Sequence, residues 1–227
     1  MGIYIIFGIF TLISWAISNT LKNRLKEYSQ YPTLNNLTGK EIAERMLADN
    51  GIRDVKVIST NGQLTDHYNP IEKTVNLSHD VYNGQNISAA AIAAHECGHA
   101  VQHAKAYAWL QFRSRIVPFV SVTSRYIQWV LLIGVLTLNI FPALLGLGIL
   151  LFAVMTLFSF ITLPVEFDAT RRGLDWLNHT RIVNGEYMPK ATSALNWAAM
   201  TYVVAALSSL ATLMYYVMIY SGRRSNN

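Results

Sequence analysis

Three long runs without a charged side chain constrain the fold of this chain most strongly. They cover residues 1–21, 126–165 and 191–222. A membrane-spanning helix needs roughly 20 mostly apolar residues, so the second run is long enough for two helices. Asn139 and Pro142 mark the expected turn between them. With 52% hydrophobic and 14% charged residues, the composition also departs from that of a typical soluble domain. The sequence therefore predicts an integral membrane protein.

We expect three to four transmembrane helices. The expected spans lie near residues 3–20, 119–139, 143–164 and 196–219. The first apolar run has no basic residue ahead of it, whereas Lys22, Arg24 and Lys26 follow it. This pattern favours an uncleaved N-terminal anchor over a cleaved signal peptide. The second span carries Arg125, a charge that has to lie at the membrane interface or inside the protein.

The distribution of Lys and Arg predicts the orientation of the chain. Of the 18 basic residues, twelve fall within residues 22–125 and four within 171–190. The positive-inside rule therefore places residues 22–118 and 165–195 on the cytoplasmic side. The remaining arginines, at 223–224, then fall outside, a mild conflict that a last helix lying along the membrane would remove.

Charge and cysteine content narrow the set of partners. The formal net charge is +5, but the basic residues cluster beside apolar spans, which indicates lipid headgroups rather than nucleic acid. The single cysteine excludes an internal disulfide and fits a reducing compartment. We expect contact with the lipid bilayer and none with nucleic acid, and the sequence leaves an oligomer open.

Two helices are expected in the segment between the first two spans. Residues 37–52 form an amphipathic pattern, with Thr38 as the N-cap and Glu41 three residues later. Ser88 is the expected cap of a second, alanine-rich helix that begins "SAAAIAAHECGHA". The two helices flank a region with strand patterns.

The strand patterns between these helices predict a small α+β unit. "DVKVIST" (54–60) and "KTVNLSH" (73–79) read as strands, and "LTDHYNP" (64–70) reads as the turn between them. Residues 73–78 suit two alternatives equally. They could offer an edge to an extended peptide, or they could form a core strand.

The stretch "AHECGHA" (94–100) carries the chemistry. On a helix His95 and His99 lie about 40° apart and one turn apart, so both imidazoles face one way and can hold one metal ion. Glu96 is displaced by about 100°, so it can act as a base on a nearby water without being a ligand. The alternatives are a structural metal ion and plain core histidines. We favour a catalytic zinc, because histidines inside an Ala- and Gly-rich helix need a reason.

A catalytic zinc ion needs a third protein ligand. His103 continues the same helix face but lies about 12 Å from His95 along the axis, so it is expected to support the site or face solvent. Glu166, the first charge after the third span, is the better candidate, and Asp168 is its rival. The alternative for Glu166 is an ion pair with the arginines at 171–172.

Three further residues could stabilise a developing oxyanion, although each also suits a loop or a supporting position. These are His67, His79 and Tyr82. Gly98 is expected to let another backbone approach the motif helix, and Cys97, on the opposite face from His95, is expected to be a small core residue.

Several of these motifs resemble those of a known family. "LTDHYNP", "KTVNLSHDVY", "AAHECGHAVQHA" and "LPVEFDATRR", together with the anchor and the membrane hairpin, resemble the YugP-like neutral zinc metallopeptidases of bacterial membranes, and more distantly the HtpX-type proteases. The resemblance implies His95, His99 and Glu166 as ligands and Glu96 as the base. One position departs from the pattern. HtpX-like chains usually carry Asp four residues after the ligand Glu, where this chain has Thr170.

The sequence therefore predicts an α-helical membrane protein with a small α+β, zincin-like (gluzincin-type) catalytic domain. The expected parts are an anchor (1–21), a cytoplasmic catalytic region (22–118), a transmembrane hairpin (119–164), a cytoplasmic helix with the third ligand (165–195), a last membrane helix (196–220) and a frayed tail (221–227).

The expected function is that of a multi-pass endopeptidase of the bacterial cell membrane with one Zn²⁺ per chain. Its substrates would be membrane or membrane-proximal proteins or peptides, as in membrane-protein quality control. A zinc-stabilised scaffold or chaperone that does not cut its clients is the alternative. A metal transporter is disfavoured, because the spans hold almost no ionisable residues to line an ion path.

Overall fold

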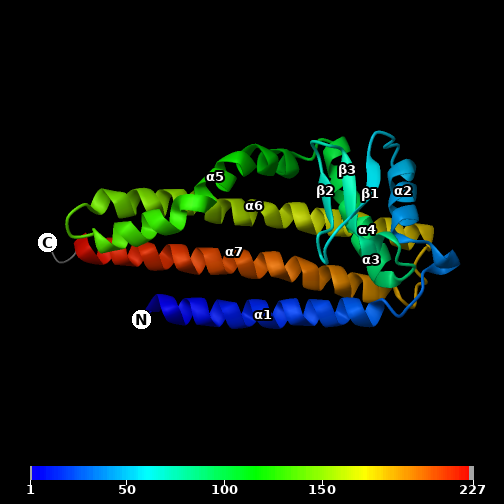
Figure 1. Cartoon of the computed structure of the whole chain (residues 1–227), viewed down its shortest axis with the longest axis horizontal. Coiled ribbons are helices and arrows are strands. Elements are labelled where there is room, and N and C mark those ends of the chain that lie inside the picture. The colour runs from blue at the N-terminus through cyan, green and yellow to red at the C-terminus, as the bar shows by residue number, and fades with distance from the viewer. Residues whose placement is uncertain (1, 225–227) are drawn as a thin grey trace. The chain divides into compact units, whose positions relative to one another are not determined.

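The computed structural model describes residues 2–224 of the chain (Figure 1). The helices are α1 (Gly2–Tyr28), the short 3-10 helix η1 (Leu34–Asn36), α2 (Gly39–Asp49), α3 (His79–Tyr82), α4 (Ile87–Ala104), α5 (Ala108–Leu136), α6 (Pro142–Thr180) and α7 (Met188–Arg224). The strands are β1 (Lys56–Thr60), β2 (His67–Asn69) and β3 (Thr74–Ser78). The described residues belong to two compact units. One holds those within 1–15, 111–163 and 201–227, and the other holds residues 16–110 and 164–200.

Within residues 2–224, four helices are long and apolar enough to cross a membrane. They cover Tyr4–Tyr28, Ala108–Leu136, Pro142–Thr180 and Met188–Gly222. Each overlaps one expected span and extends beyond it at one end or both, but the second helix ends at Leu136, before the expected end of its span near residue 139. Helix α6 continues past residue 164 to Thr180, so the residues around Glu166 are the continuation of a membrane helix. The expected cytoplasmic helix at 165–195 is the end of α6, a turn around Asn184 and the start of α7.

In the first unit, α5 and α6 pack through glycines. A Cβ atom on Gly134 would lie 2.8 Å from the Cα atom of Leu145, and one on Gly148 would lie 2.9 Å from a methyl carbon of Leu131. Ile127, Leu131 and Leu145 form the buried centre of this contact. Small residues let apolar helices approach closely where no hydrophobic effect drives them together. The expected membrane hairpin is therefore a closely packed helix pair.

The second unit contains a three-stranded sheet in the order β1-β3-β2. Strand β1 pairs parallel with β3, with Lys56 opposite Thr74, and β2 pairs antiparallel with β3, with His67 opposite Asn76. Strand β3 is therefore central and buried along its whole length. Of the two alternatives for residues 73–78, the core strand is correct. The edge strand that packs with α4 is β2.

Strand β2 lies in the segment that the sequence predicts to be a turn, so that prediction is wrong in part. The Asn69 side-chain oxygen accepts hydrogen bonds from the backbone N–H groups of Ile71 (3.0 Å) and Glu72 (3.1 Å). The reversal of the chain thus begins at Asn69, and the preceding three residues are free to pair with β3.

Helices α2, α3 and α4 pack with the sheet around one hydrophobic core (Figure 1). The predicted capping box at the start of α2 is confirmed, because Thr38 and Glu41 bond each other's backbone N–H groups. The predicted cap of α4 is wrong. Asn86 accepts from the Ala89 N–H at 3.0 Å, whereas the Ser88 hydroxyl donates to the carbonyl of Leu25 in α1 at 2.7 Å.

Candidate metal centre

The close approach of α4 and α6 within the second unit positions the candidate site. A Cβ atom on Gly98 of α4 would lie 2.4 Å from the Ala169 carbonyl oxygen, and one on Gly173 of α6 would lie 2.9 Å from the Ala94 carbonyl. A real Cβ atom fits at neither position. The expected role of Gly98 is confirmed, and Gly173 makes the second contact from the opposite helix. Backbone contact at these two points brings the side chains between them within bonding distance.

Those side chains are His95, His99 and Glu166. One ligand atom from each lies within 4.8 Å of the others. The Glu166 Oε2 atom lies 3.4 Å from His95 Nε2 and 3.5 Å from His99 Nε2. A tetrahedral zinc ion with bonds of about 2.0–2.2 Å holds its ligand atoms roughly 3.4 Å apart. The two distances and the N, N, O donor set therefore both fit zinc.

The other ring nitrogen of each histidine faces a hydrogen-bonding partner. His95 Nδ1 lies 3.1 Å from the Thr170 hydroxyl, and His99 Nδ1 lies 3.0 Å from the side-chain oxygen of Gln102. Such partners fix the orientation of a ligand histidine. Thr170 occupies the position where HtpX-like chains usually carry Asp, so the hydroxyl itself makes the contact there.

Gln102 determines which nitrogen of His99 carries the proton. Its side chain is fully buried, and its amide nitrogen donates to the Val165 carbonyl at 2.8 Å and to Asp168 Oδ2 at 2.9 Å. Since both of these groups only accept, the amide oxygen must be the atom that faces His99. It accepts the proton of His99 Nδ1, and the lone pair of His99 Nε2 is left for a metal.

Asp168 is engaged away from the cluster. It accepts hydrogen bonds from Arg171 at 2.7 Å and from Arg172 at 2.6 Å, in addition to the one from Gln102. The arginines that were the alternative partners of Glu166 therefore pair with Asp168 instead. Asp168 reaches the site only through Gln102 and His99, in a supporting position rather than among the three clustered ligand atoms.

Glu96 lies beside the cluster and is only 8% exposed. Its pKa is raised from 4.5 to about 7, mainly by burial; the charge of His95 acts to lower this pKa, and that of Glu166 acts to raise it. A carboxyl group whose pKa lies near neutral pH can both accept and return a proton. Strand β2, which begins at His67, packs with α4, so His67 lies on the strand next to the motif helix.

The remaining expected site residues lie elsewhere in the second unit. His79 Nδ1 contacts the Asn83 amide at 2.8 Å, and His103 Nδ1 contacts the Tyr68 hydroxyl at 2.7 Å. The Tyr82 ring packs under the Lys40 ammonium. None of these three contacts is with the clustered ligand atoms. The sequence reasoning missed Gln102, although a buried amide three residues after a candidate ligand on an apolar helix is a recognisable signal.

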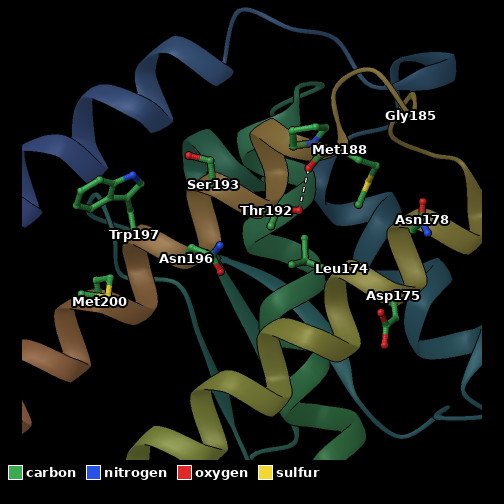
Figure 2. Close-up of a pocket in the computed structure, with 11 residues that line it drawn as sticks. Leu174, Asp175, Asn178, Gly185, Met188, Thr192, Ser193, Asn196, Trp197 and Met200 are labelled. Carbon is green, nitrogen blue, oxygen red and sulfur yellow. Dashed lines mark hydrogen bonds between the residues drawn. The ribbon is translucent and has the colours of Figure 1, made fainter.

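A cleft in the second unit is separate from the cluster. It has a volume of about 830 Å³ and lies between the end of α6 and the start of α7 (Figure 2). Figure 2 shows the Thr192 hydroxyl bonded back to the Met188 carbonyl of its own helix, at 3.0 Å. None of the three clustered residues lines this cleft, so its size gives no information about the metal.

A family match and a similar protein both indicate a peptidase. Residues 3–221 match a protein family described as "Putative neutral zinc metallopeptidase". The chain is 39% identical over 227 residues, 99% of both sequences, to a protein of Bacillus subtilis (strain 168) named "Putative membrane protease YugP". No solved structure matches the chain.

Proposed function

The chain belongs to the family of neutral zinc metallopeptidases, as its motifs predicted, and we propose that it is an endopeptidase of the HExxH-plus-Glu type with one zinc ion per chain. His95, His99 and Glu166 would hold the ion. The observation that carries this proposal is the convergence of their three ligand atoms within 4.8 Å. A hydrolytic zinc site uses three protein ligands and leaves one position open.

The proposed division of labour follows from the surroundings of each side chain. When bound, zinc polarises the scissile carbonyl and lowers the pKa of water towards about 7. Glu96 takes the proton from the attacking water and delivers it to the leaving amine, a role that its pKa of about 7 supports. Thr170 and Gln102 keep the two imidazoles oriented. His67 is the proposed donor to the developing oxyanion, because it begins strand β2, which packs with the motif helix α4.

We also propose a zincin-like arrangement of substrate and sheet. Strand β2 is an edge strand that packs with α4, the helix that carries both histidines. An extended peptide pairs with such an edge through main-chain hydrogen bonds. The β2 edge, rather than that of the central β3, would align the scissile bond along α4.

The proposed substrates are membrane or membrane-proximal proteins. Glu166 lies on α6, whose N-terminal part is apolar enough to span a membrane, so the site is tied to the membrane surface. The distribution of Lys and Arg favours the cytoplasmic side. Membrane-protein quality control in a bacterial cell membrane is the role that suits such a site. Cleavage of soluble unfolded proteins as readily as of bilayer-anchored ones would contradict the substrate proposal.

The first test is elemental analysis of zinc in the purified protein, with Glu166→Ala and Asp168→Ala beside the wild type. We expect about one zinc in the wild type and in Asp168→Ala, and a loss with Glu166→Ala. Retention of zinc without Glu166 would require a different third ligand. Glu96→Gln should keep zinc and abolish cleavage, which also excludes a role limited to scaffolding.

A further inference from the structure

A second pocket, of about 500 Å³, lies at the first turns of α4. Its walls are the last turns of α1, the loop that leads into β2, the start of α3 and the first turns of α4. We call it the α1 pocket. Among the side chains that line it are Lys22, Lys26, Asp66, Asp80 and Ile92. None of the three clustered ligand residues lines it, so it is a space beside the candidate metal centre.

The α1 pocket lies on the same face of α4 as the reacting groups. Ile92 precedes His95 by three residues and Glu96 by four, and side chains at these spacings are neighbours on a helix. The distance along the axis is about 4.5–6 Å. A peptide segment held at Ile92 is therefore less than two residues of extended chain from Glu96, at about 3.3 Å per residue.

The opposite side of the pocket is fixed near the motif as well. The Asp66 carboxylate accepts hydrogen bonds from the Ser78 backbone N–H at 2.7 Å and from the Ser78 hydroxyl at 3.0 Å. His67, the next residue, begins the edge strand β2. A peptide paired with that edge would thus run directly past the pocket.

The wall formed by α1 is docked to the rest of the second unit. The Ser88 hydroxyl of α4 donates to the Leu25 carbonyl at 2.7 Å, and the Tyr28 hydroxyl donates to Ser193 of α7 at 3.2 Å. Tyr28 is only 4% exposed. The end of the N-terminal helix is therefore a built part of the pocket, in addition to its expected role as an anchor.

The α1 wall carries two positive charges that no acidic side chain neutralises. Lys22 and Lys26 are four residues apart on one helix face, both are exposed, and neither forms an ion pair with any residue within 2–224. Arg24, between them, pairs with Glu27 at 3.1 Å and does not line the pocket. Asp66 and Asp80 bring negative charge to the opposite side. The pocket therefore has a basic wall on α1 and an acidic wall on the loop and α3.

We propose that the α1 pocket is a substrate subsite that takes an acidic side chain close to the scissile bond, with Lys22 and Lys26 as its specificity-determining residues. This inference rests on the proposed peptidase function and adds the substrate chemistry of the site. The basic wall attracts Asp or Glu, and the same wall disfavours Lys or Arg in that orientation. The membrane anchor thereby selects which segments are cut.

The test is cleavage-site profiling of a randomised decapeptide library by mass spectrometry, with the full-length enzyme in liposomes. We expect the wild type to prefer Asp or Glu over Lys or Arg at one position beside the cut. Lys26→Glu should reduce that preference about tenfold or reverse it. Arg24→Glu is the matched control, because it makes the same charge change on the same helix outside the pocket. An unchanged preference in Lys26→Glu, or equal shifts in both variants, would overturn the proposal.

A second measurement separates this proposal from the peptidase activity itself. In a Glu96→Gln background, a photocrosslinking residue replaces Leu64, which lines the pocket, and the same library is added. Capture of acidic peptides, and its loss with Lys26→Glu, would support the subsite even if the wild type cut nothing. The control replaces Ile71, which is 91% exposed and outside the pocket. Equal capture at both positions, or none at Leu64, would overturn the proposal.

Discussion

Two pairs of helices in this molecule approach closely at glycines, but the two contacts enclose different kinds of side chain. In the first unit, α5 and α6 meet at Gly134 and Gly148, against Leu145 and Leu131. In the second unit, α4 and α6 meet at Gly98 and Gly173, backbone against backbone. The first contact encloses apolar side chains. The second encloses two histidines and a carboxylate, so the same packing device serves stability in one unit and chemistry in the other.

The buried polar groups of the two units also differ in how they are hydrogen-bonded. In the first unit, the buried hydroxyls of Thr156 and Thr162 donate to carbonyls of their own helix, and Thr156 also contacts the Ser209 hydroxyl of α7 at 2.7 Å. In the second unit, Gln102 bridges from α4 to Val165 and Asp168 on α6. A hydroxyl bonded within its helix is satisfied wherever the helix packs, whereas the bridge depends on the register of two helices. Damage to packing should therefore affect function only in the second unit.

The largest contrast is expected between Gly98→Val and Gly134→Val. The new side chain at 98 has to displace the Ala169 backbone, and with it Glu166, so we expect zinc to be lost and peptidase activity to fall by about 10³ or more. At 134 the new side chain displaces Leu145, which should lower the thermal stability in detergent while zinc content stays at about one per chain. Zinc content and unfolding temperature are measured on the same samples.

A result in which both valine variants lose zinc equally would break the comparison, because it would show that hairpin packing also controls the metal centre. Gly98→Ala is the milder partner of Gly98→Val. It places only the Cβ atom against Ala169, so zinc should be weakened rather than lost.

Glu96→Gln should stabilise the metal-free protein, in a pH-dependent way. Burial raises the folded-state pKa of Glu96 to about 7, so the wild type has its full stability below the ordinary pKa of 4.5 and loses it as pH rises through about 7. The amide of Gln stays neutral at every pH, so the variant does not lose this stability. Above pH 7 the free energy of unfolding of Glu96→Gln should exceed that of the wild type by on the order of 3 kcal/mol. Thermal unfolding in EDTA between pH 4.5 and 8 measures this difference.

The control for this pH dependence is Glu41→Gln on the exposed end of α2. Hydrogen bonds from Thr38 lower the pKa of Glu41, so its contribution to stability is present above the ordinary pKa and is lost as pH falls. The two variants should therefore change stability in opposite directions. An equal effect of Glu96→Gln at every pH would show that the carboxyl group is not the cause.

Gln102→Leu should weaken zinc binding by about 10- to 100-fold, the usual cost of losing a group that orients a ligand. His99 loses its partner at Nδ1, and the Val165 carbonyl and Asp168 lose a donor. Thr156→Val, which removes a comparable buried bond to Ser209 in the first unit, should leave the zinc affinity unchanged. Competition with a chromogenic chelator measures both constants, and equal losses in the two variants would contradict the assignment.

The sequence was most informative where one helix decides the geometry. The spacing of His95 and His99 places both side chains on one face whatever surrounds the helix, and Thr38 with Glu41 marks a helix start through local bonds alone. Glu166 could be singled out by its position after a span, but Asp168 stayed open. Only the register of α6 against α4 places Glu166 beside the histidines and Asp168 beside Gln102.

Features that depend on distant contacts were missed for the same reason. Strand β2 has three residues and exists because β3 pairs with it, so its own pattern is too short to predict it. Asn86 and Ser88 are both good caps by composition. Asn86 is the N-cap of α4, because the Ser88 hydroxyl instead donates to the carbonyl of Leu25 in α1, which lies 63 residues away in the sequence. Local preference could not separate these alternatives.

The smallest expected effect is at Thr170, and it sharpens the comparison between the two histidines. Thr170→Val removes the hydroxyl 3.1 Å from His95 Nδ1 and keeps the side-chain volume, so we expect a loss of zinc affinity of only about five- to tenfold, since one hydrogen bond contributes about 1 kcal/mol. Thr170→Asp should match or exceed the wild-type affinity, because a carboxylate is a stronger acceptor for His95 Nδ1–H. If Thr170→Val costs as much as Gln102→Leu, the two histidines are oriented with equal stringency. If Thr170→Asp binds zinc more weakly than Thr170→Val, the hydroxyl does not stand in for the carboxylate and His95 is held by packing alone.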